Sequence, residues 1–181
     1  MKTPKLIMVA LTSFILFSGC AMEQRIAQTP SGRPEVVIDS NDMDLVKSSI
    51  INEMQTANYQ LQNDSQYRLA FTKQLEGGQG FMAQLLLGNS YSTPPIAEVS
   101  FNLSKQASKI KVMEFSSIST QMAFGQVNRG DMKDNNAWFN GFYLLLQRVK
   151  TTAEKDNKVI AALEEKPAKK ESGVYSIEVR P

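Results

Sequence analysis

The sequence has no histidine and only one cysteine among its 181 residues. Without histidine the chain cannot form a Ser-His-Asp triad or a Cys-His pair, and it lacks the commonest protein ligand of zinc. A single cysteine cannot form a disulfide within the chain, so the fold must be stabilised by packing alone. These absences exclude the usual hydrolase mechanisms, and nothing else in the sequence predicts a cofactor or a metal site.

Positive charge is not in excess once the N-terminal residues are set aside. The chain has 20 basic and 18 acidic residues, and the surplus consists of Lys2 and Lys5, because no acidic residue precedes Cys20. A nucleic-acid-binding protein gains most of its affinity from clustered Lys and Arg side chains. The balanced charge therefore argues against a nucleic-acid partner.

The first twenty residues have the layout of a secretory signal. Two lysines precede an apolar stretch over residues 6–17, and the segment closes with Phe17-Ser18-Gly19-Cys20. A charged start, an apolar middle and small residues at the end are typical of a cleaved export signal. The apolar stretch is shorter than the roughly 20 residues of a membrane-spanning helix, which makes an uncleaved anchor the weaker alternative.

Residues 17–20 resemble the lipobox of bacterial lipoproteins, with Phe17 at the position where the family usually has leucine. The resemblance implies that residues 1–19 are a lipoprotein signal peptide and that Cys20 is acylated, with palmitate among the acyl groups. Several acyl chains on one cysteine hold a protein stably on a membrane. In this family, an aspartate directly after the cysteine tends to retain the lipoprotein in the inner membrane. Here Ala21 follows, which implies lipid anchoring on the periplasmic side of the outer membrane.

The rest of the chain divides into a tether, one domain and a tail. Residues 20–34 mix polar residues with proline and glycine and predict the acylated cysteine and a flexible tether. Residues 35–150 are long enough for one globular domain. Residues 151–181 predict a charged linker, which begins as a fraying extension of the preceding helix, and a terminal edge strand over 174–179, which either completes its own sheet or adds to another chain.

Two helices are predicted from hydrophobic periodicity. A short apolar strand over 35–39 precedes Asp42, whose carboxylate is suited to cap a helix. Apolar residues at three- and four-residue steps then predict a helix over 43–58. The same spacing predicts a second helix over 138–149, which follows a loop over 125–131.

The remaining segments alternate between apolar and polar residues and predict antiparallel strands. A hairpin is expected across a turn at residues 63–65, followed by a strand over 97–103 and its neighbour over 109–119. Met113 and Phe115 break the alternation in the last strand. This break indicates either a bulge or a strand that is partly covered on both faces.

Together these elements predict a single α+β domain: an antiparallel sheet of about four to five strands with two helices packed on one face, in the order β-α-β-β-β-β-α. This order over residues 35–150 resembles the small helix-grip domains of outer-membrane assembly lipoproteins. The resemblance concerns the fold and implies no functional residues.

One apolar segment has two interpretations. The glycine-rich residues 77–80 lack the lysine and hydroxyl of a phosphate loop and predict a hinge, after which an apolar segment runs over 81–87. This segment is either a short helix that closes the core or an exposed flap that covers a partner or a ligand. In the second case the apolar surface consists of Phe81, Met82, Leu85, Leu86, Trp138 and Phe142.

No catalytic residues are predicted. The carboxylate pairs Asp42 with Asp44 and Asp131 with Asp134 stand at predicted helix starts, where capping accounts for them. We therefore expect a non-enzymatic cell-envelope lipoprotein that binds another envelope protein as an accessory or assembly subunit. The alternative is a carrier of a lipid or a small apolar ligand. A prophage or plasmid exclusion lipoprotein and an envelope enzyme are further alternatives.

Overall fold

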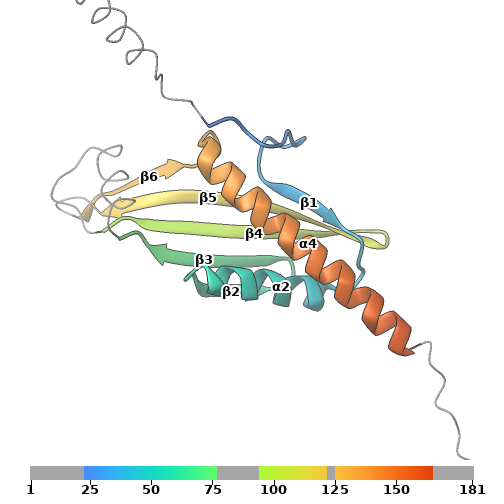
Figure 1. The fold of residues 1–181 in the computed structure, drawn as a ribbon. Coiled ribbons are helices and arrows are strands. Elements are labelled where there is room, and N and C mark those ends of the chain that lie inside the picture. Colours follow the sequence, from blue (N-terminus) through green and yellow to red (C-terminus); the bar gives the residue numbers. More distant parts are fainter. Residues whose placement is uncertain (1–22, 77–93, 122–124, 165–181) are drawn as a thin grey trace, which may run out of the picture.

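The structure is a computed structural model that describes residues 23–76, 94–121 and 125–164. These residues form a six-stranded antiparallel sheet with two helices on one face (Figure 1), which confirms the predicted single α+β domain. The elements are β1 Glu35–Ile38, α2 Met43–Thr56, β2 Gln60–Ser65, β3 Arg68–Gln74, β4 Ile96–Gln106, β5 Lys109–Gln121, β6 Val127–Asp131 and α4 Asn136–Glu164.

The sheet is built around the long hairpin of β4 and β5. The strand order is β1-β5-β4-β3-β2, and β6 also pairs with β5. β1 lies against residues 110–113 of β5, and β6 lies against residues 117–121. The two short strands therefore follow each other along the same edge of β5.

Both helices begin at side-chain caps. The Asp42 carboxylate accepts hydrogen bonds from the backbone N–H groups of Asp44 and Leu45, each at 3.0 Å, as the sequence predicts. The Asn135 side-chain oxygen accepts a 3.0 Å hydrogen bond from the Trp138 N–H at the start of α4. Each cap satisfies a backbone donor that the first helical turn leaves without a partner.

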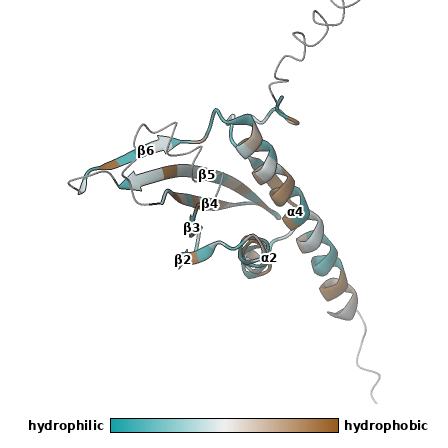
Figure 2. Ribbon diagram, turned by 60° about the vertical axis from the view of Figure 1, so that its left-hand side comes forward, coloured by the Kyte–Doolittle hydropathy of each residue, from teal (hydrophilic) through white to brown (hydrophobic). Residues whose placement is uncertain are grey.

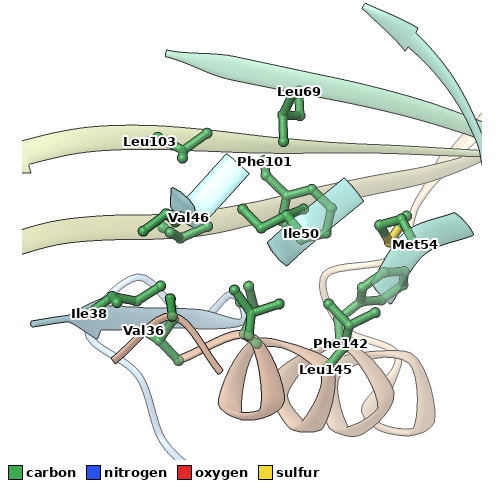
Figure 3. Close-up of a cluster of buried hydrophobic side chains, with 14 of the residues drawn as sticks. Val36, Ile38, Val46, Ile50, Met54, Leu69, Phe101, Leu103, Phe142 and Leu145 are labelled. Carbon is green, nitrogen blue, oxygen red and sulfur yellow. The ribbon is translucent and has the colours of Figure 1, made fainter. Parts of the chain in front are cut away.

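The core lies between the helices and the face of the sheet that they cover, which we call the inner face. Alternate residues of β3, β4 and β5 point into it, and α2 and α4 contribute their apolar stripes (Figure 3). Phe101 of β4 packs edge-on against Phe71, with the ring centres 6.0 Å apart. The centre of the Phe101 ring lies 6.3 Å from that of Phe142 in α4. The largest buried apolar side chains include Phe71, Phe101, Phe139, Ile38, Ile50, Met54, Leu69, Ile110 and Leu146.

Residues 23–34, the N-terminal segment, lie against the start of α4, although the sequence predicts a flexible tether there. Arg25 donates a 3.0 Å hydrogen bond to the Asn136 side chain, and the Asn140 side-chain oxygen accepts one of 2.9 Å from the Ile26 N–H. The folded part of the chain therefore begins before β1.

Several element boundaries differ from the sequence predictions. The turn between β2 and β3 lies at residues 66–67 rather than 63–65, and β2 carries a bulge between Leu61 and Asn63. β5 pairs without a register shift, so the broken alternation there reflects the second alternative, partial cover on both faces. α4 begins at Asn136 and continues to Glu164, in agreement with the helical extension predicted after residue 149.

The sequence prediction of a loop over 125–131 was wrong, because residues 127–131 form β6. Figure 2 shows this strand as mostly hydrophilic. It lacks an alternating apolar pattern, and its pairing with β5 determines its conformation. The predicted strand over 174–179 lies outside the described residues.

Candidate functional site

The second face of the sheet, which we call the open face, is not covered by either described helix (Figures 1 and 2). A groove of about 580 Å³ lies on it and is lined by residues of β2 to β6 and by Arg33. We call it the open-face groove. Its lining includes Arg33, Arg68, Glu98, Phe115, Arg129 and Asp131.

The strand register brings the charged residues of this groove together. Ser117 of β5 lies between Glu98 of β4 on one side and Asp131 of β6 on the other, because it pairs with both. One pair further along, Ser119 lies opposite Arg129. Residues two apart on a strand share a face, so all these side chains point into the open face.

The carboxylate of Glu98 is held by two neighbouring strands. Arg129 forms an ion pair with one of its oxygens and donates a 2.9 Å hydrogen bond from Nε to the Ser117 hydroxyl. The Ser119 hydroxyl donates a 2.9 Å hydrogen bond to the other oxygen of Glu98. Both carboxylate oxygens therefore have a donor.

A second ion pair crosses from the N-terminal segment to β6. The Arg33 guanidinium contacts both oxygens of Asp131, at 2.6 and 3.4 Å, and lies 4.8 Å from the centre of the Phe115 ring. The hydrogen bonds from Arg33 are the main reason that the pKa of Asp131 is lowered, and the Lys133 N–H at 2.8 Å adds to the effect. This arrangement fixes a guanidinium over an aromatic ring at the wall of the groove.

Arg68 differs from the other two arginines of the groove. Among the described residues it forms no ion pair, and its Nη2 lies 3.4 Å from the Ser100 hydroxyl oxygen. Ser100 is paired with Phe115 on the next strand. The groove thus contains three guanidinium groups and two carboxylates, and Arg68 carries the surplus positive charge.

A buried carboxyl group lies directly behind the groove, on the inner face. Glu114 is 1% exposed, and one of its oxygens has no hydrogen-bond partner among the described residues. Burial raises its pKa to about 7, and a hydrogen bond with Ser116 partly opposes this rise in the pKa. Burial and the nearby charge of Glu114 raise the pKa of Tyr59 to about 12.

The apolar surface predicted from the sequence is only partly within the described residues. Phe142 is 7% exposed, and the ring of the half-buried Trp138 lies 5.6 Å from it, so both rings pack in the core. Phe81, Met82, Leu85 and Leu86 lie outside the described residues, as does Cys20. Asp131, predicted at a helix start, instead ends β6 and pairs with Arg33.

Sequence reasoning missed the open-face groove. Its charged residues occupy the polar positions of alternating strands, and such positions normally face water without further function. The one signal in the sequence was Phe115, an aromatic residue on the polar side of β5. Arg33 and Arg129 gave no signal, because one was assigned to the tether and the other to a loop.

Both carboxylates of the groove are engaged by arginines. The described residues include no group of three or more His, Cys, Asp or Glu side chains that could hold a metal ion. Nor does the described part of the chain contain a helix long and apolar enough to cross a membrane. Comparisons with protein-family models and with curated proteins return no match.

Proposed function

We propose that this chain is a non-enzymatic lipoprotein of the cell envelope that binds another envelope protein through the open-face groove. The observation that carries the proposal is the one-sided packing of the fold. α2 and α4 cover the inner face, whereas the open face holds a groove in which ion pairs already fix Arg33 and Arg129. Groups fixed before binding lose little conformational entropy when a partner binds.

The lining of the groove favours a protein partner over a lipid or a small apolar ligand. Its lining includes the hydroxyl groups of Thr72, Ser100 and Ser117 and three guanidinium groups, together with the aromatic ring of Phe115. Protein interfaces combine aromatic and arginine anchors with polar surroundings in this way. The space between the sheet and the helices, where an apolar ligand would be sheltered, contains the packed side chains of Phe101, Phe142 and their neighbours.

The N-terminal pattern supports the location. A charged start, an apolar stretch and Cys20 after two small residues fit an exported protein that is acylated at Cys20 and held on the periplasmic side of the outer membrane. We expect labelled palmitate to enter the chain but not its Cys20→Ser variant, which should leave the membrane fraction. Equal sedimentation of both proteins with membranes, without label in either, would contradict the anchor.

The binding function is tested by photo-crosslinking in cells that make the full chain. A photo-reactive amino acid is placed at Gln62 or Ser117 in the groove, and at Leu144, which is exposed on the outer side of α4, as the control. We expect a discrete protein adduct from the two groove positions and none from Leu144. Absence of an adduct at both groove positions, or equal adducts at all three, would show that the groove does not bind a protein.

A further inference from the structure

We infer that the open-face groove recognises an acidic peptide segment, whose carboxylate pairs with Arg68 and whose neighbouring apolar side chain packs on Phe115. This inference rests on the proposed protein-binding function and adds the chemistry of the partner. The groove has an unpaired positive charge. Of its three arginines, Arg33 and Arg129 are neutralised by Asp131 and Glu98, so Arg68 is the cation that remains for a ligand.

The surroundings of Arg68 leave its guanidinium free to bind a carboxylate. Among the described residues, the Arg68 guanidinium contacts the Ser100 hydroxyl alone, and that distance of 3.4 Å is long for a hydrogen bond. A carboxylate accepts two parallel hydrogen bonds from a guanidinium, and these are shorter and stronger than a bond to a neutral hydroxyl. Ser100 can then donate its proton to the same carboxylate. A carboxylate of the ligand would therefore accept hydrogen bonds from two donor groups, the Arg68 guanidinium and the Ser100 hydroxyl.

An aromatic ring, that of Phe115, lies near Arg68 on the same face of the sheet. Ser100 pairs with Phe115 across β4 and β5, and the face of the Phe115 ring lies under the Arg33 guanidinium. An apolar side chain of the ligand can pack against the ring and the stem of Arg33. Successive side chains of an extended peptide point to opposite sides, so residues two apart in the ligand reach Arg68 and Phe115 together.

The test uses the full acylated chain in detergent and two synthetic hexapeptides with blocked ends. One has glutamate and leucine two residues apart with serine between them, and the other has glutamine in place of glutamate. We expect the glutamate peptide to bind about tenfold more tightly, as measured by fluorescence anisotropy. Arg68→Ala should remove this preference, and Arg68→Lys should keep part of it, because lysine retains the charge without the paired donors.

The matched control is Lys109→Ala, which removes one exposed positive charge from β5 outside the groove. It should leave the preference unchanged. Equal binding of both peptides, or an unchanged preference in Arg68→Ala, would overturn the inference. Failure of this inference can be distinguished from failure of the proposed function. If crosslinking from Gln62 and Ser117 is undiminished in Arg68→Ala, the groove binds a protein but does not recognise it through an acidic segment.

Discussion

The two faces of one sheet are organised in opposite ways. On the inner face, alternate residues such as Val99, Phe101 and Val112 are buried against two helices. On the open face, the residues between them form cross-strand ion pairs and hydrogen bonds around a groove. Burial of apolar area stabilises a fold, whereas exposed ion pairs contribute little. The inner face therefore supplies most of the stability of the domain, and neither described helix covers the open face.

The largest expected difference between the faces comes from two phenylalanines. Phe101→Ala should lower the free energy of unfolding by about 4 kcal/mol, because it leaves a cavity in a closely packed core. Phe115→Ala on the open face should cost about 1 kcal/mol. Denaturant unfolding of both variants in a common Cys20→Ser background measures the two losses. Equal losses would mean that the open face is also part of the core.

Glu114 is an exception on the inner face, and its effect should depend on pH. Its pKa in the folded protein is about 7, above the ordinary value of 4.5, so between these values the folded chain keeps a proton that the unfolded chain has released. The stabilising contribution is complete below about pH 4.5 and is lost as the pH rises through 7.

We therefore expect the wild type to lose roughly 3 kcal/mol relative to Glu114→Gln between pH 4.5 and pH 7. Unfolding measured at several pH values gives this difference. Parallel stability curves for the two proteins over that range would show that the Glu114 side chain is not the titrating group.

Asn140 of α4 is a second buried polar residue, with only 5% of its surface exposed. Its side chain bonds to the N–H of Ile26 and to the carbonyl of Gln24. Asn140→Ala should cost about 2 kcal/mol, since it leaves backbone groups without partners. It should also speed tryptic cleavage at Arg25. Unchanged cleavage would indicate that other contacts hold the N-terminal segment.

The smallest effect is expected at the ion pair of Glu98 and Arg129. Glu98→Gln keeps the shape of the side chain and should change the free energy of unfolding by no more than about 1 kcal/mol. The same denaturant series measures it, with wild type as the reference. A loss comparable to that of Phe101→Ala would show that the ion pairs of the open face stabilise the fold as much as the inner core does.

The sequence predicted the inner face well and the open face poorly, and the reason is physical. Apolar periodicity located α2, the hairpin of β4 and β5 and the start of α4, because each of these must bury a stripe. β6 has no such stripe, since Arg129 and Asp131 are positioned only by pairing with β5 and by contacts with Glu98 and Arg33. Long-range contacts of this kind leave no local pattern to read.

The contact between residues 23–34 and α4 also governs how the domain would be held at a bilayer. If Cys20 carries the lipid as proposed, only three peptide steps separate it from Glu23, and an extended chain of that length spans about 10 Å. α4, at 29 residues, is about 43 Å long. Because the Glu23 carbonyl accepts a hydrogen bond from Asn136, the start of α4 would lie close to the headgroups, and a partner would have to bind the domain near the membrane surface.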